Sequence, residues 1–235
     1  MTGRDALQSR ESSFPTCGAH TFIPWKTEGE RNRQGLGGST AMVEYDEGTA
    51  LVVVDVQNDF ADPAGSLYVT GGERVIPMAN REIESALADG ALVVYTQDWH
   101  PERTPHFDVD GGAWPVHCVG GTWGAEFHPD LEVKGEIVRK GTRGEDGYSG
   151  FTARDTATGD DAPTPLVDLL RNRSIRRVVI LGLATDYCVK ETALDALELG
   201  FETILLKDGI RAVDLESGDG ERALRAVETA GGRLG

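Results

Sequence analysis

No stretch of this 235-residue sequence approaches the roughly 18 consecutive apolar residues that a membrane-spanning helix requires. Positive charge is also scarce. The 23 Lys and Arg residues face 39 Asp and Glu residues, which gives a formal net charge of −16 at pH 7. Such a chain repels phosphate groups, so we expect neither a nucleic-acid partner nor an anionic membrane surface. We interpret the acidity as a source of solubility.

Cysteine is rare as well, with only Cys17, Cys118 and Cys188. Three scattered cysteines do not form the disulfide framework of a small secreted protein, and at least one of them must be free. The first residues lack the basic-then-apolar order of a secretory signal peptide. Both observations predict a cytoplasmic location. The sequence leaves the oligomeric state open between monomer and homodimer.

The first 47 residues differ from the rest of the chain. Their segment GERNRQGLGGST is polar and glycine-rich and has neither a helical nor a strand period. This composition predicts a flexible N-terminal tail over residues 1–47 and a single domain over residues 48–235. Cys17 and His20 resemble half of a metal site, but no second pair lies nearby, so we interpret them as part of the tail.

From residue 50 onward, strand and helix patterns alternate. The β-branched run ALVVVDV predicts a strand buried on both faces, and Ile76, Ala79, Ile83 and Leu87 recur at helical spacing. Further strands are expected at 91–96, 136–140, 177–182 and 202–206, and further helices at 164–172, 189–199 and 221–230. The alternation predicts an α/β fold, a three-layer αβα sandwich around a mostly parallel sheet of about five or six strands.

A dinucleotide-binding domain would share this layout. Its glycine fingerprint belongs directly after the first strand, where this sequence reads QNDF. The glycine-rich GLGG lies before that strand instead, so the sequence argues against NAD binding by this route.

Reactive side chains stand at the predicted strand ends, where open parallel sheets bind ligands. Asp55 ends the first strand, Lys140 ends the third, and Cys188 follows the fourth at the start of a helical pattern. A helix dipole and a nearby ammonium lower a thiol pKa, so we expect Cys188 to be a nucleophile whose proton passes to Asp55. A cysteine in this position is, by itself, more often a small buried hydrophobe. The convergence of three such groups on one edge favours catalysis.

Three of the five histidines follow the second strand. Asp98 and His100 are two positions apart in an extended segment and point to the same side, and His106 and His117 could complete a site of three or four ligands. Carboxylate and imidazole donors suit zinc, iron(II) or manganese, so we expect one divalent metal ion. The alternatives are a histidine-rich loop held by ordinary hydrogen bonds and a closed structural zinc site that uses Cys118.

Five motifs stand out along the chain: DVQNDF (55–60), the D-W-H…H segment (98–106), WPVHC (114–118), RKGTRGEDGYSGF (139–151) and GLATDYC (182–188). They resemble those of the nicotinamidase/pyrazinamidase family, which belongs to the isochorismatase-like, or cysteine hydrolase, superfamily. The motifs occur in the family's order. The resemblance implies hydrolysis of nicotinamide to nicotinate and ammonia through a cysteine thioester in NAD salvage, with pyrazinamidase activity. The expected partner is therefore a small-molecule amide.

The resemblance also implies residue roles. It implies a catalytic triad of Asp55, Lys140 and Cys188. It implies metal ligands at Asp98, His100 and His117, with His106 as a fourth. It implies substrate contacts from Phe60, Trp114 and Tyr148. It further implies a cis peptide between Leu183 and Ala184 and an oxyanion hole formed by the N–H groups of Ala184 and Cys188.

Two other functions are kept as alternatives. One is a related, metal-independent cysteine amidohydrolase that acts on another small amide, and the other is a non-catalytic metal-binding protein of the same fold. Tyr187 stands where some family members have histidine, and the loop between Lys140 and Tyr148 varies in length within the family. Both departures bear on substrate preference more than on chemistry.

Overall fold

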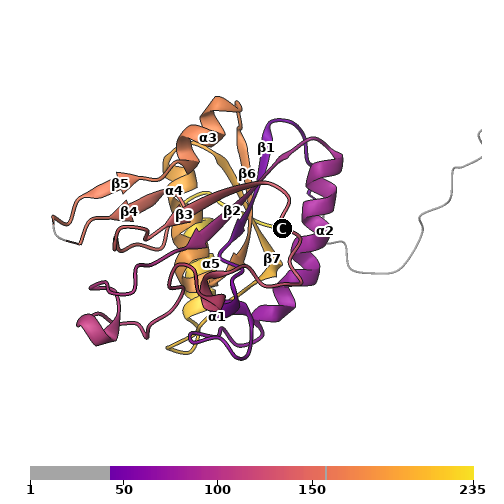
Figure 1. The fold of residues 1–235 in the computed structure, drawn as a ribbon. Helices are drawn as coiled ribbons and strands as arrows, with labels where there is room; N and C mark the ends of the chain where they lie inside the picture. Colours follow the sequence, from indigo (N-terminus) through magenta and orange to yellow (C-terminus); the bar gives the residue numbers. More distant parts are fainter. Residues whose placement is uncertain (1–42, 157) are drawn as a thin grey trace, which may run out of the picture. The chain divides into compact units, whose positions relative to one another are not determined.

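A six-stranded sheet forms the centre of the computed structural model, which describes residues 43–156 and 158–235 (Figure 1). Its strands run in the order β3-β2-β1-β6-β7-β8, and every pairing between neighbours is parallel. The strands are β1 (Thr49–Val54), β2 (Leu92–Asp98), β3 (Glu136–Lys140), β6 (Arg177–Leu183), β7 (Glu202–Arg211) and β8 (Arg233–Leu234). The predicted α/β sandwich with a parallel sheet is confirmed.

The longer helices cover both faces of this sheet (Figure 1). Helix α2 (Ile76–Ala88) packs on one face, and α3 (Leu166–Asn172), α4 (Lys190–Glu198) and α5 (Asp219–Thr229) pack on the other. The buried stripe of α2 follows the predicted spacing with one change. Leu87 is 42% exposed, and the neighbouring Ala86 is buried in its place.

Strand β1 lies inside the sheet, between β2 and β6, and all six of its residues are buried. Side chains alternate between the two faces of a strand. Leu51 and Val53 accordingly join the core under α2, while Val52 and Val54 join the core under α3, α4 and α5. The continuous apolar run therefore reflects burial on both faces.

Several short elements escaped the sequence patterns. Strands β4 (Thr152–Arg154) and β5 (Asp161–Pro163) form a separate antiparallel ribbon. The remaining short elements are helix α1 (Asn58–Ala61) and the helical turns η1 (Gly72–Val75), η2 (Asp108–Asp110), η3 (Trp123–Ala125) and η4 (Thr185–Val189). Two- and three-residue strands carry too few positions to show a period of two.

The described chain packs against the domain before β1 begins. Tyr45 is buried, and its hydroxyl donates to Glu82 on α2 over 2.7 Å. The folded part thus includes a residue that the sequence assigned to the tail. Residues 1–42, with Cys17 and His20, lie outside the described residues, so the flexible tail stays a prediction. Among the described residues, no helix is both long and apolar enough to cross a bilayer.

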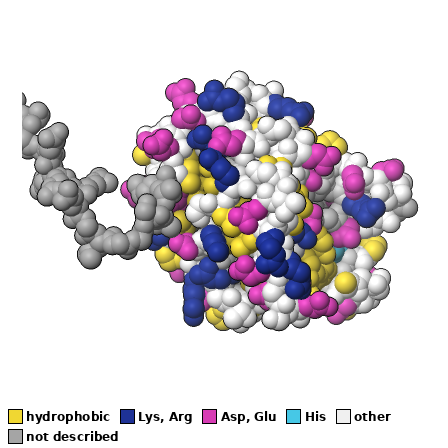
Figure 2. Space-filling model, turned by 180° about the vertical axis from the view of Figure 1, so that it is seen from behind, with side chains coloured by type: hydrophobic (Ala, Val, Ile, Leu, Met, Phe, Trp, Pro, Cys, Tyr) yellow, Lys and Arg dark blue, Asp and Glu magenta, His cyan; other side chains and the backbone are white. Residues whose placement is uncertain are grey.

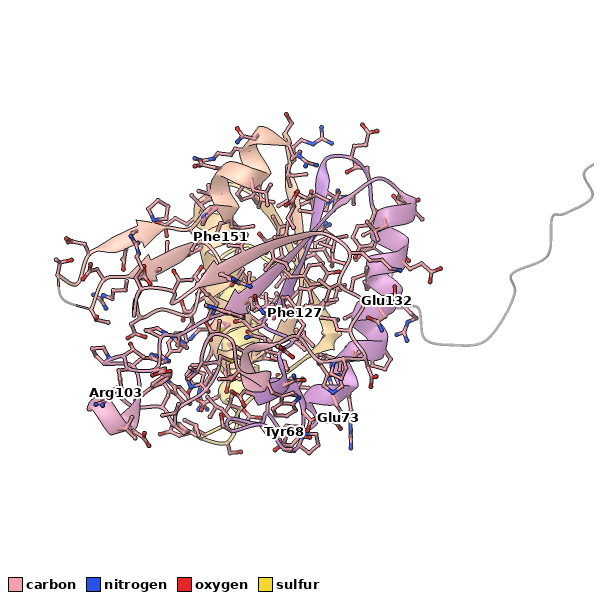
Figure 3. The ribbon with its side chains drawn as sticks, in the orientation of Figure 1. Tyr68, Glu73, Arg103, Phe127, Glu132 and Phe151 are labelled. Atoms are coloured by element: carbon pink, nitrogen blue, oxygen red, sulfur yellow. The ribbon has the colours of Figure 1, made fainter. Side chains whose placement is uncertain are left out.

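Apolar side chains fill the interior of the domain, and charged side chains lie on its surface. Phe151 is almost fully buried and Phe127 packs against the core under α2, and both lie within the body of the domain in Figure 3. Figure 2 shows one face of the surface, where acidic and basic side chains are interspersed. No large field of positive charge is visible on that face.

Candidate active site

The carboxyl ends of four strands place the predicted reactive residues at one edge of the sheet. Asp98 ends β2 directly opposite Lys140, which ends β3, in the register of that pairing. Asp55 follows β1 with a φ of 47°, in the left-handed region that aspartate tolerates better than most residues. Cys188 lies in η4, directly after β6. The parallel register thus gathers residues that are up to 133 positions apart in the sequence.

Lys140 joins the three groups of the predicted triad. Its Nζ lies 2.9 Å from Asp55 Oδ2 and donates to Cys188 Sγ over 3.6 Å. It also donates to Asp98 Oδ1. Asp55, Lys140 and Cys188 are each at least 93% buried, so water screens these interactions only weakly.

Lys140 contacts the carboxylates of Asp55 and Asp98, and the pKa values of these two groups shift in opposite directions. Burial raises the pKa of Asp55, and the opposing attraction of Lys140 does not cancel this effect. Burial acts on Asp98 in the same direction, but Lys140 and His100 outweigh it and lower the pKa of Asp98 to about 2. Asp55 is therefore the stronger proton acceptor of the pair.

The pKa of Cys188 shifts in the opposite direction to the one predicted. Burial raises it well above its ordinary value, Lys140 opposes that shift, and Asp55 and Asp98 add to it. The sulfur lies in the π-helical turn η4, which runs directly into α4, so Cys188 does occupy the first turn of this helix. The expectation of a lowered thiol pKa was wrong. The resting cysteine is a thiol, and its proton must be removed when substrate binds.

Asp55 has one oxygen available to take that proton. Its Oδ1 accepts a hydrogen bond from Thr96 Oγ1 over 2.7 Å. Its Oδ2 makes the ion pair with Lys140 but has no hydrogen bond of acceptable geometry among the described residues. Carboxylate oxygens of Asp55 and Asp98 and the sulfur of Cys188 lie within 4.8 Å of one another. The sequence did not single out Thr96, although a polar residue in the apolar run ALVVYT was a usable signal.

The loop after β6 carries the predicted oxyanion hole. The peptide bond between Leu183 and Ala184 is cis, as the family resemblance implied. Gly182 precedes it with a φ of 121°, and a Cβ there would lie 2.1 Å from the carbonyl oxygen of Val54, so only glycine fits. Ala184 and Cys188 both line a cleft, where their N–H groups could meet a bound substrate.

The three histidines of the predicted metal site lie together. One ring nitrogen from each of His100, His106 and His117 falls within 4.8 Å of the others, and all three residues are buried. His100 Nε2 also lies 3.8 Å from Asp98 Oδ2. His106 lies in a loop that we call the histidine loop, residues 99–117. An ion pair closes part of this loop: Arg103, labelled in Figure 3, donates from Nε to Asp110 over 2.7 Å.

The hydrogen bonds of these histidines suit a metal. His106 Nδ1 lies 2.7 Å from Asp146 Oδ1, and His117 Nδ1 lies 2.7 Å from the carbonyl oxygen of Pro115. Both ring nitrogens of the buried His100 lack a hydrogen-bond partner among the described residues. Burial lowers the pKa of His100 to about 4, which keeps the ring neutral. Neutral imidazoles beside one carboxylate fit a divalent metal ion.

A second group of candidate ligands does not fit a metal. Asp55, Asp98 and Cys188 are also close enough together to hold an ion. The Lys140 ammonium contacts all three, however, and already supplies the positive charge. The histidine group and the ammonium thus occupy two adjacent positions, and Asp98 contacts both.

A cleft of about 460 Å³, including its open mouth, connects the two positions. The predicted residues Phe60, Trp114 and Tyr148 form aromatic walls, and the Trp114 indole donates to the Tyr148 hydroxyl over 3.0 Å. Tyr187 adds a fourth ring, whose centroid lies 5.0 Å from that of Trp114. The sequence missed the apolar part of the lining, which comprises Leu67, Val69, Leu183 and Val213.

The comparisons with known proteins agree with this geometry. The family model described as Isochorismatase domain matches residues 49–234. The nicotinamidase of Escherichia coli (strain K12) is 37% identical over 204 residues, which cover 79% of this chain and 93% of that protein. The pyrazinamidase of Pyrococcus horikoshii, solved in complex with zinc, has a TM-score of 0.71 at 43% identity and covers 80% of this chain and 98% of its own. PnC1 from L. infantum, solved with nicotinate, has a TM-score of 0.73 at 36% identity, with coverages of 82% and 94%.

Proposed function

The chain belongs to the isochorismatase domain family, and we propose that it is a nicotinamidase, which hydrolyses nicotinamide to nicotinate and ammonia and also accepts pyrazinamide. The observation that carries this proposal is the position of Lys140, which contacts Asp55, Cys188 and Asp98 at once. A nucleophile with its base therefore lies next to a group of metal ligands at the floor of an aromatic-walled cleft. A flat ring that carries a carboxamide fits such a site.

In the first half of the reaction, Asp55 Oδ2 accepts the thiol proton and the Cys188 sulfur attacks the carboxamide carbon. The N–H groups of Ala184 and Cys188 stabilise the oxygen anion that forms. The carbon–nitrogen bond then breaks, and the proton held by Asp55 passes to the departing nitrogen, which leaves as ammonia. The product at this stage is a thioester on Cys188.

In the second half, Asp55 accepts a proton from a water molecule, which attacks the thioester carbon. The carbon–sulfur bond breaks, the proton held by Asp55 passes to the Cys188 sulfur, and nicotinic acid leaves and gives its own proton to water to become nicotinate. Lys140 stays charged throughout, because burial disfavours its charge less than Asp55 and Asp98 favour it. It offsets the negative charge that moves between Asp55 and Cys188.

Aromatic side chains would hold the substrate ring. Phe60, Trp114 and Tyr148 line the cleft, and the bond from Trp114 to Tyr148 fixes two of these walls against each other. A planar ring gains apolar contact between such walls without losing internal freedom. We expect this part of the cleft to select flat aromatic amides over flexible aliphatic ones.

Asp98, His100 and His117, with His106, would hold one divalent metal ion, and zinc, iron(II) and manganese all suit these donors. Such an ion would supply an electrophilic centre that binds a ring nitrogen of the substrate and orients it.

A panel of amides tests the assignment. Release of ammonia should be rapid with nicotinamide and pyrazinamide, and much slower with benzamide, which has the same shape but no ring nitrogen. Equal rates with benzamide would reject the role of the ring nitrogen. Turnover of an aliphatic amide in preference to all three would favour the amidohydrolase with another substrate.

A further inference from the structure

Among the three clustered histidines of the described residues, His106 has a distinct partner. Its Nδ1 lies 2.7 Å from a carboxylate oxygen of Asp146, forty positions along the chain. His117 Nδ1 lies next to a backbone carbonyl oxygen instead, and neither ring nitrogen of His100 has a hydrogen-bond partner among the described residues. The His106 side chain is only 7% exposed, so the surrounding packing and this bond together fix how its ring is turned.

We propose that Asp146 is a positioning residue, whose carboxylate turns the His106 ring so that Nε2 faces His100 and His117, where a metal ion would bind. The inference rests on the proposed function only in assuming that a metal ion binds this group. An ionised carboxylate accepts hydrogen bonds and donates none, so the proton in the bond belongs to His106 Nδ1. In the neutral ring the lone pair is then on Nε2, which is the atom that would bind a metal ion.

Both partners are held in place by the protein itself. The Asp146 backbone N–H donates to the carbonyl oxygen of Arg154 over 2.8 Å, and its side chain also accepts from Gly147 N over 2.8 Å. Thr104, in the histidine loop, donates from Oγ1 to the carbonyl oxygen of Gly144 over 3.3 Å. This bond joins the loop that carries His106 to the loop that carries Asp146. A ligand fixed in this way loses little freedom when the metal binds.

The loop of Asp146 also connects the candidate metal ligands, which we call the metal group, to the aromatic wall of the cleft formed by Trp114 and Tyr148. Tyr148 follows Asp146 two residues later, lines the cleft and accepts the hydrogen bond of Trp114. The His106 and Tyr148 rings lie 6.4 Å apart between centroids. One loop therefore carries both the residue that orients a metal ligand and a residue that contacts the substrate ring.

Metal affinity measured without substrate tests the proposal. Chelator-stripped protein is titrated with Zn²⁺ in competition with a chromophoric chelator. Asp146→Ala and His106→Ala should each weaken zinc binding by about 10- to 100-fold, the usual effect of losing such a partner. Because Asp146 acts through His106, Asp146→Ala should have no further effect in the His106→Ala background. Asp146→Asn keeps an acceptor oxygen and should lose less than Asp146→Ala.

A neighbouring acid provides the matched control. Glu145 lies in the same loop but pairs with Arg143 over 2.7 Å and contacts no histidine, so Glu145→Ala should bind zinc with an affinity within about twofold of wild type. The visible spectrum of the Co²⁺-loaded protein should change in Asp146→Ala and stay unchanged in Glu145→Ala.

Three results would overturn the proposal. They are an Asp146→Ala affinity within about threefold of wild type, additive losses in the double variant, and a loss in Glu145→Ala equal to that in Asp146→Ala. A fully zinc-loaded wild type that releases no ammonia from nicotinamide would instead reject the proposed function and leave the affinity result valid.

Discussion

The ammonium of Lys140 lies 3.6 Å from the sulfur of Cys188. Because the same ammonium contacts Asp55 and Asp98, one buried cation serves both the nucleophile and a carboxylate of the metal group. The chemistry we propose depends on this arrangement, since a thiolate formed in a buried site needs a positive charge beside it. The arrangement also has a consequence for stability.

Replacing Lys140 should destabilise the fold as well as abolish turnover. Lys140→Met leaves Asp55 and Asp98 buried without their cation, which typically costs about 3–5 kcal/mol. Urea unfolding of chelator-treated protein measures this loss. The control is Lys134→Met, because Lys134 is 58% exposed and pairs with Glu132 at the surface, where such a pair is worth about 0–1 kcal/mol. Equal losses in the two variants would contradict the account.

Thr96 should matter for rate more than for binding. Its hydroxyl holds Asp55 Oδ1 and leaves Oδ2 to accept the thiol proton. Thr96→Val should lower kcat by about 10- to 100-fold, because a hydrogen bond to a charged group is worth roughly 1.5–3 kcal/mol. KM for nicotinamide should stay within about threefold of wild type, since Thr96 does not line the cleft. Thr96→Ser should recover most of the rate, and a serine variant as slow as the valine variant would contradict this role.

The metal should serve substrate binding more than folding. The sheet has apolar cores on both faces, so chelation or His100→Ala should leave the circular dichroism spectrum unchanged while metal content and turnover of nicotinamide fall. Alkylation of Cys188 by iodoacetamide should be largely retained. His128→Gln is the control, because His128 is also buried but pairs with Asp62 outside the metal group. Full activity in chelator, with no metal found by elemental analysis, would contradict the prediction.

Deleting residues 1–41 should change neither activity nor melting temperature appreciably. The family match begins at residue 49, and the shortened chain keeps Tyr45 and its bond to Glu82. The deleted segment has no apolar period with which to pack on the domain. Thermal unfolding of the full-length and shortened proteins tests this. A drop of several degrees would show that the segment contributes to the folded state.

Local patterns predicted five of the six strands of the sheet and the edge that carries the site, but not the two-residue strand β8. The third predicted strand, 136–140, matches β3 residue for residue, and the four reactive strand ends meet as a parallel sheet requires. Strands at the centre of a parallel sheet are buried on both faces, so their apolar runs stand out in the sequence.

Properties that depend on surroundings could not be predicted in this way. The raised pKa of Cys188 comes first from burial, which a motif does not reveal. Thr96 and Asp146 act through single contacts to Asp55 and His106, across 41 and 40 positions of the chain. Their own neighbours in the sequence give no sign of these partners. Such supporting residues become visible only when the fold brings the segments together.

Ammonia release from nicotinamide by zinc-loaded wild type and Cys188→Ala tests the central claim most directly. Wild type should release ammonia and nicotinate in equal amounts. Cys188→Ala should keep its fold and metal content but lose several orders of magnitude in turnover, because it has no nucleophile. The matched Cys118→Ala removes a buried thiol that does not line the cleft and should stay active. Turnover by Cys188→Ala at even a tenth of the wild-type rate would contradict the covalent mechanism.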